Sequence, residues 1–164
     1  MLCAASVASG CGGSSPDSTA ALKPLPATGC SLLSAADVKS FLGTASTCRP
    51  LRSNTTKQDL VAAGWQTARG DQSIKAGVSR KNIADDKETF EEEAGTKSNG
   101  GAKAVSGLGD DAFYVPDPQS ATSGSIWILH GNDVIIVAVT HGNLTGNALV
   151  KALTAAGRRL VASY

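Results

Sequence analysis

The sequence has few aromatic residues, almost no net charge and no long apolar run, and each absence excludes a class of protein. Lysine and arginine number 15 against 14 aspartate and glutamate residues, which leaves a formal net charge of +1. The basic residues are scattered, so the basic footprint of nucleic-acid binding is missing and we expect no nucleic acid as a partner. The longest apolar run, Val134 to Val139, is far shorter than the roughly 20 residues of a membrane-spanning helix and predicts a buried strand.

Recognisable catalytic motifs are also missing. No G-x-S-x-G nucleophile elbow occurs, and the serines stand next to no visible base. The glycines of Ser106–Gly109 lack the Lys-Ser/Thr of a phosphate-binding loop and predict a bend before a strand. We therefore expect a protein that is not an enzyme and that binds no cofactor.

The N-terminal residues have the composition of a lipoprotein leader. Residues 1–11 begin with a short apolar stretch and end in the small residues Ala8-Ser9-Gly10-Cys11. Residues 12–28, rich in Gly, Ser, Pro, Ala and Thr, predict a disordered tether. We expect a truncated signal peptide, since its basic residues are missing, then a lipid on Cys11, the tether, and a single domain over 29–164. The alternative is a low-complexity N-terminus with incidental cysteines.

Four cysteines are present, at positions 3, 11, 30 and 48. If Cys3 leaves with the leader and Cys11 carries a lipid, Cys30 and Cys48 remain as a pair. In an oxidising extracytoplasmic compartment the expected state of such a pair is a disulfide. The alternatives are two buried free thiols or half of a metal site.

The first half of the domain predicts one helix followed by two strands. Ser34 and Asp37 form a capping-box pattern at a helix start, and Gly43 stands where a left-handed C-cap belongs. Residues 65–69 and 74–79 alternate between polar and apolar or small side chains, which is the period of half-buried strands.

The second half predicts a surface helix, three strands and a terminal helix. The terminal helix is amphipathic, because its leucines recur with helical spacing. Helices that flank runs of hairpin-linked strands favour an α+β fold, with an antiparallel sheet of about five strands, helices on one face and the order α-β-β-α-β-β-β-α. The predicted ranges are 86–94 for the surface helix, 112–115, 125–130 and 134–141 for the strands, and 145–161 for the terminal helix.

Three segments together resemble a known family. They are the lipoprotein-like N-terminus, Cys30-Ser31-Leu32-Leu33-Ser34-Ala35-Ala36-Asp37-Val38, and Gly107-Leu108-Gly109-Asp110-Asp111-Ala112-Phe113-Tyr114. This pattern resembles the small lipoproteins of actinobacterial cell envelopes that are grouped as a domain of unknown function. In that family a second cysteine often precedes the tryptophan of an early strand, whereas here Cys48 lies far upstream of Trp65. The resemblance implies an extracytoplasmic domain anchored to the bacterial cell membrane.

The candidate site residues are aromatic, because aromatic side chains supply contact area at little entropic cost. We expect Trp65, Tyr114 and Trp127 to contact a partner, with core packing as the alternative for each. His130 and His141 each end a strand of the predicted hairpin and could form a proton switch or a metal pair. The alternative is two side chains that face solvent, and we expect no metal site.

These observations predict a membrane-anchored module that binds a small ligand, an envelope polymer or an envelope protein. Two other classes stay open. One is an envelope hydrolase or transferase with an unrecognised site, which would need convergent titratable groups in a pocket. The other is a structural or chaperone-like envelope protein, which would need a large exposed apolar patch.

Overall fold

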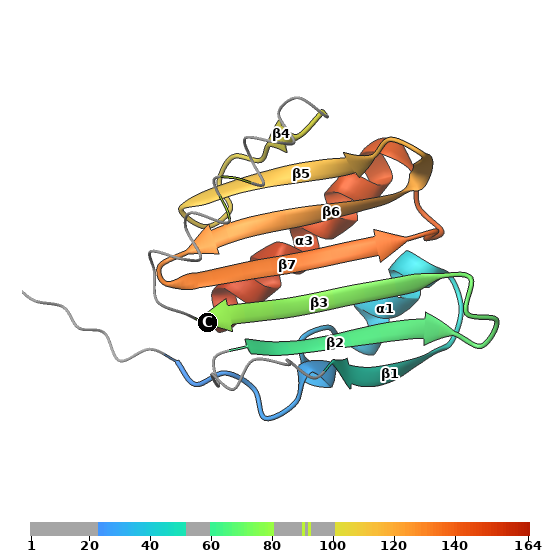
Figure 1. Ribbon diagram of the computed structural model, residues 1–164, viewed down its shortest axis with the longest axis horizontal. Helices are drawn as coiled ribbons and strands as arrows, with labels where there is room; N and C mark the ends of the chain where they lie inside the picture. The colour runs from blue at the N-terminus through green and yellow to red at the C-terminus, as the bar shows by residue number, and fades with distance from the viewer. Residues whose placement is uncertain (1–22, 52–59, 81–89, 91, 93–100) are drawn as a thin grey trace, which may run out of the picture.

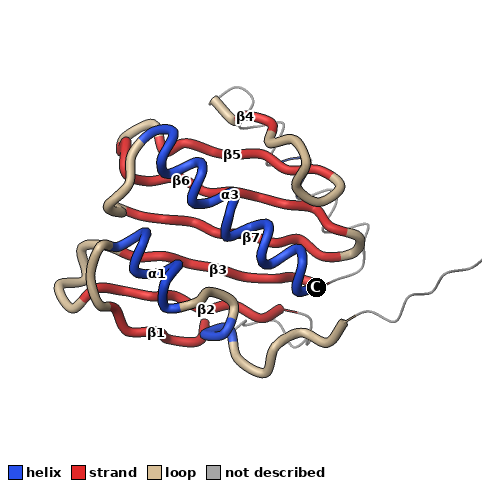
Figure 2. Tube along the Cα trace, turned by 180° about the vertical axis from the view of Figure 1, so that it is seen from behind, coloured by secondary structure: helices blue, strands red, loops and turns tan. Residues whose placement is uncertain are grey.

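The computed structural model describes residues 23–51, 60–80, 90, 92 and 101–164. Within these residues an antiparallel sheet of seven strands, in the order β1-β2-β3-β7-β6-β5-β4, carries helices on one face (Figures 1 and 2). The predicted α+β class with an antiparallel sheet is confirmed. The elements are η1 (Gly29–Ser31), α1 (Ala35–Leu42), β1 (Ser46–Leu51), β2 (Leu60–Thr67), β3 (Ser73–Arg80), β4 (Lys103–Ala104), β5 (Asp111–Asp117), β6 (Ser120–His130), β7 (Asp133–Thr140) and α3 (Gly146–Ser163).

The sheet is built from two meanders that meet at its centre. Strands β1, β2 and β3 follow one another through hairpins, as do β5, β6 and β7, and β3 pairs with β7. Strand β7 lies fourth in the order of seven. Its side chains are apolar on both faces, as expected of a strand covered on both sides. The central position predicted for residues 134–139 is therefore confirmed.

The main core lies between the sheet and the helices α1 and α3 (Figure 2). On α3 the residues Leu149, Leu153, Ala156 and Leu160 are buried and face the sheet, as the helical spacing predicts. The two helices are linked across the molecule by an ion pair between Arg159 and Asp37.

The opposite face of the sheet carries a second, smaller apolar cluster. It is formed by Phe90, Phe113, Val115 and Val134, with Trp127 packed at its edge. The ring of Phe90 lies 4.9 Å from that of Phe113, centroid to centroid. The helix predicted over residues 86–94 otherwise falls almost entirely outside the described residues, apart from Glu92.

The predicted number of five strands was wrong, because the described residues contain two more. Both additional strands, β1 and β4, are at the edges of the sheet. Strand β1 has no apolar alternation and contains Pro50, which is tolerated at a sheet edge because a proline has no N–H to donate. Strand β4 has only two residues. Edge strands of this kind bury little on either face, so hydrophobic periodicity does not mark them.

The predicted disulfide between Cys30 and Cys48 is present in the structure. It joins η1 to β1, and Cys48 lies directly opposite Trp65 in the pairing of β1 with β2. The cysteine and the tryptophan, far apart in the sequence, are therefore cross-strand neighbours.

The segment before η1 contacts the folded domain. The Lys23 ammonium group donates to the carbonyl oxygen of Ala162, and Arg80 donates to the carbonyl oxygen of Lys23. Arg80 also forms a two-point ion pair with the buried carboxylate of Asp133. The last six residues of the predicted tether, 23–28, are thus part of the described structure, and Lys23 already contacts the domain. None of the described helices is long and apolar enough to cross a membrane.

Candidate ligand cavity

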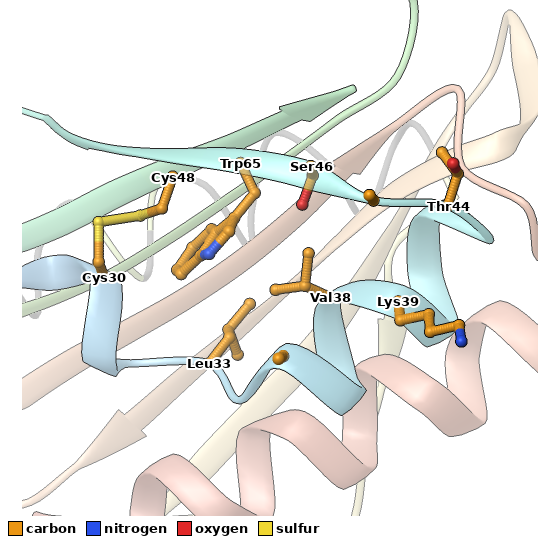
Figure 3. A pocket seen from close by; sticks show the side chains of 10 residues that line it. Cys30, Leu33, Val38, Lys39, Thr44, Ser46, Cys48 and Trp65 are labelled. Carbon is orange, nitrogen blue, oxygen red and sulfur yellow. A yellow bond between two sulfur atoms is a disulfide. The ribbon is translucent and has the colours of Figure 1, made fainter. Parts of the chain in front are cut away.

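A cavity of about 500 Å³ lies between α1 and β1, on the helix-covered side of the sheet (Figure 3). We call it the α1–β1 cavity. Its volume falls within the range of small-molecule binding sites, roughly 300 to 1,000 Å³. The residues that line it are Cys30, Leu33, Ala35, Val38, Lys39, Thr44, Ala45, Ser46, Cys48 and Trp65.

The wall formed by α1 is positioned by local sequence signals. The hydroxyl of Ser34 accepts from the backbone N–H of Asp37, and the Asp37 carboxylate accepts from the backbone N–H of Ser34. This capping box fixes the helix start and places Leu33 and Val38 together on the inner side. Gly43 ends the helix with a φ of 71°, and the chain turns there toward the residues of the cavity rim.

The opposite wall is formed by Trp65 and the disulfide. Trp65 lies on the helix-facing side of β2 and is only 5% exposed. Figure 3 shows its indole ring between the Cys30–Cys48 bond on one side and Leu33 and Val38 on the other. The hydrogen bonds of the described residues include none from the Trp65 side chain. The indole N–H therefore remains available to an acceptor in the cavity.

The polar side chains of the cavity are located at its rim. Lys39 lies in the last turn of α1, Thr44 lies between α1 and β1, and Ser46 is the first residue of β1. Neither aspartate nor glutamate is among the lining residues. The α1–β1 cavity thus combines apolar walls with side chains that donate hydrogen bonds, one of which is positively charged.

Tyr114 is located elsewhere, on the helix-facing side of β5. It is 7% exposed and lines a smaller hollow of about 210 Å³ near the start of α3. Burial, and secondarily the negative charge of Asp117, raise the pKa of the Tyr114 phenol above its ordinary value of 10.0. A Cβ atom at Gly124 would come within 2.7 Å of the Tyr114 hydroxyl, so the ring depends on a glycine in β6.

Trp127 is located on the opposite face of the sheet. Its side chain is half-buried and stacks against Phe113, with ring planes 6° apart and centroids 6.1 Å apart. Its indole N–H donates to the hydroxyl of Ser125 at 3.1 Å. The three aromatic residues predicted as contacts therefore lie in three separate places, and only Trp65 lines the α1–β1 cavity.

The two histidines do not come together. His130 lies beside the β6–β7 turn, where it pairs with Asp133, whereas His141 follows β7 at the other end of the hairpin. The backbone N–H of His141 donates to Ser123, and His130 Nδ1 is buried without a hydrogen-bond partner in the described structure. A metal pair or proton switch that needs both rings is thereby contradicted. Among the described residues no group of three histidines, cysteines or carboxylates is arranged to hold a metal.

Sequence reasoning did not identify most residues of the cavity. In the sequence Leu33 and Val38 are noted only as part of the segment that resembles a known family, and Thr44, Ala45 and Ser46 carry no signal. The one local clue was the sequence of a helix C-cap at Gly43 followed closely by Cys48, because a disulfide at that place must bring β1 near the start of α1.

The chain was compared with family models, curated proteins and solved structures, and none of them matches it.

Proposed function

We propose that the protein is a lipid-anchored binding module of the bacterial cell envelope, and that it holds a small apolar ligand in the α1–β1 cavity. The observation that carries this proposal is the cavity itself, with its volume of about 500 Å³ and walls of Leu33, Val38 and Trp65. Concave, mostly apolar sites with a few polar groups are the usual form of small-molecule binding sites.

Two features support a location outside the cytoplasm. The Cys30–Cys48 disulfide joins two segments of the domain, and structural disulfides persist mainly in oxidising compartments. The N-terminus up to Cys11 resembles that of actinobacterial envelope lipoproteins. Together they favour a domain that is exported, acylated on Cys11 and anchored to the outer side of the cell membrane.

The geometry of the domain agrees with such an anchor. Lys23 contacts Arg80 and Ala162, where β3 and α3 end, and Figure 1 shows the C-terminus beside this end of β3. Ser46 at the cavity rim pairs with Thr67, which places it at the other end of the sheet. The chain from Cys11 to Lys23 reaches at most about 40 Å when fully extended. The anchor would therefore hold the domain near the membrane with the cavity rim at the end away from it.

A fluorescence titration tests binding in the cavity. Trp127→Phe leaves Trp65 as the only tryptophan and keeps an aromatic ring against Phe113. The probe is N-phenyl-1-naphthylamine, which is neutral and apolar and accepts excitation energy from indole. We expect saturable energy transfer from Trp65, because the bound probe would lie against its ring.

A filled cavity provides the matched control. Ala35 and Ala36 are both exposed on the first turn of α1, but only Ala35 lines the cavity. In the Trp127→Phe background, we expect Ala35→Phe to raise the Kd of the probe at least about tenfold, because the added ring takes up space in the cavity. A tenfold change corresponds to about 1.4 kcal/mol, the size of one lost hydrophobic contact. Ala36→Phe should leave it unchanged. Equal binding by both variants, or no saturable binding by the parent, would contradict the proposed function.

A further inference from the structure

We infer that the ligand of the α1–β1 cavity is a single-chain amphiphile with an anionic head group, its chain against Trp65 and its head at Lys39. This inference rests on the proposed function and adds the chemical class of the ligand. It depends on three observations: the apolar walls of the cavity, the presence of a hydrogen-bond donor on each of its polar side chains, and the positive charge of Lys39 at its rim.

The deep part of the cavity suits a hydrocarbon chain. Leu33, Val38 and the Trp65 ring face one another across it, and the Cys30–Cys48 bond closes one side (Figure 3). Apart from the indole N–H of Trp65, these groups make only nondirectional contacts, which suit methylene groups better than the many hydroxyls of a sugar or the amides of a peptide. A volume of about 500 Å³ also excludes a folded partner.

The polar side chains that reach the cavity all have an N–H or O–H to donate. They are the ammonium group of Lys39, the hydroxyls of Thr44 and Ser46, and the indole N–H of Trp65. Trp65 is only 5% exposed, and its indole N–H has no hydrogen-bond partner among the described residues. Among the described residues His130 Nδ1 is the one fully buried side-chain nitrogen or oxygen without a partner, so the Trp65 nitrogen still reaches the surface, and an acceptor oxygen on the ligand can replace water at this N–H.

The charge at the rim selects the sign of the head group. Asp37, on the same helix, is engaged by Arg159 and by Ser34. In the part of the chain that the structure describes, no carboxylate lies within ion-pair distance of Lys39. Arg49 and Arg69 line a separate hollow at the β1 edge, where Asp71 interacts with Arg69, so the charge that faces the cavity is that of Lys39. An anionic group is attracted there, whereas a cation finds no lining carboxylate.

A competition experiment with matched amphiphiles tests the inference. The Trp127→Phe protein is loaded with N-phenyl-1-naphthylamine, and the probe is displaced by palmitate, by palmitoyl-lysophosphatidylglycerol or by the neutral monopalmitoylglycerol, all below micelle formation. We expect both anionic compounds to displace the probe at concentrations at least about five times lower than the neutral one, a difference of about 1 kcal/mol. Tighter binding of palmitate would indicate a free fatty acid as the ligand, and tighter binding of palmitoyl-lysophosphatidylglycerol would indicate a membrane lysophospholipid.

Substitution of single lysines separates the local charge from the overall charge. Lys39→Gln should abolish the preference for anionic amphiphiles, and added salt should reduce it. Lys75→Gln removes an equal charge from the exposed face of β3, away from the cavity, and should leave the preference intact. Retained preference in Lys39→Gln, or equal displacement by neutral and anionic compounds, overturns the inference and leaves the proposed function standing. Absence of probe binding to the Trp127→Phe protein overturns both.

Discussion

Two glycines in the bend before β5 share a backbone conformation but differ in their surroundings. Gly107 and Gly109 have φ values of 70° and 64°, which L-residues with a side chain rarely adopt. A Cβ atom at Gly107 would meet nothing within 4 Å, whereas at Gly109 it would collide with the carbonyl oxygen of Leu129. A comparison of the two positions therefore separates two free-energy costs of adding a side chain, that of the left-handed backbone and that of a steric clash.

Substitution by alanine should reveal this difference. We expect Gly107→Ala to lower the free energy of unfolding by about 1 kcal/mol, the cost of a left-handed residue. Gly109→Ala should lower it by about 1 to 3 kcal/mol more, because the backbone of β6 must shift. Urea denaturation of both variants measures the difference, and equal losses would contradict the described packing of this bend on β6.

The phenol of Tyr114 should make the folded protein sensitive to alkaline pH. Its pKa in the folded state is raised above 10.0, mainly by burial, so the folded chain keeps this proton longer than the unfolded chain does. The corresponding stability is complete below about pH 10 and is lost as the pH rises through the folded-state pKa. Urea denaturation on both sides of pH 10 should show a smaller alkaline loss for Tyr114→Phe than for the parent. An unchanged pH profile would contradict burial of the phenol.

For a single residue, the sequence predicts the type of secondary structure better than it predicts which residues surround the side chain. Alternation along the chain predicts a strand at Trp65, although β2 runs over Leu60–Thr67 and not over 65–69, and the residues around the indole come from η1, α1 and β1. Trp65 and Trp127 each lie in the second strand of a meander, yet they face opposite sides of the sheet. A single residue pattern does not show which of two aromatic side chains will border a cavity.

Among the elements, the two helices differ in how their first turns are capped. The hydroxyl of Ser34 accepts from the backbone N–H of Asp37 at the start of α1, whereas Thr145 at the start of α3 makes no side-chain cap. We expect Ser34→Ala to lower the free energy of unfolding by about 1 kcal/mol. Thr145→Ala should change it by less than about half of that, since no capping bond is lost. Thermal unfolding of both variants checks the difference, and a larger loss for Thr145→Ala would contradict the described caps.

Elements with strong local signals were predicted and elements without them were not. The capping box and C-cap glycine predict α1, and spaced leucines predict α3, because these signals need only neighbours in the chain. The central strand β7 is predicted by its run of apolar residues. The edge strands β1 and β4 form because a partner strand lies beside them, which the local pattern does not encode.

For the molecule as a whole, the disulfide is both a structural link and a cavity wall. Cys30 and Cys48 are 18 residues apart, and a closed loop of this length stabilises the folded state by about 3 kcal/mol on the chain-entropy model. We expect the Cys30→Ser/Cys48→Ser double variant to lose about that much stability by urea denaturation. It should also bind N-phenyl-1-naphthylamine more weakly, since η1 is no longer tied to β1. Unchanged probe binding by a folded double variant would show that the cavity forms without the bond.

The cavity itself was beyond prediction from the sequence. Its walls come from η1, α1, β1 and β2, and its shape depends on how the Gly43 turn and the disulfide set the distance between helix and strand. The N-terminal composition, by contrast, is a local feature, and it alone gives the expected lipid on Cys11. The proposed anchor and the proposed ligand therefore depend on independent observations.

Native mass spectrometry of the protein extracted from the membranes of the cell that makes it tests the central claim most directly. The account predicts a chain that begins at an acylated Cys11, lacks two hydrogens because Cys30 and Cys48 are joined, and carries one bound amphiphile. The Ala35→Phe variant, with its cavity filled, should have the same covalent mass without the bound amphiphile. An unacylated chain with free thiols, or a bound mass that Ala35→Phe does not remove, would contradict the account.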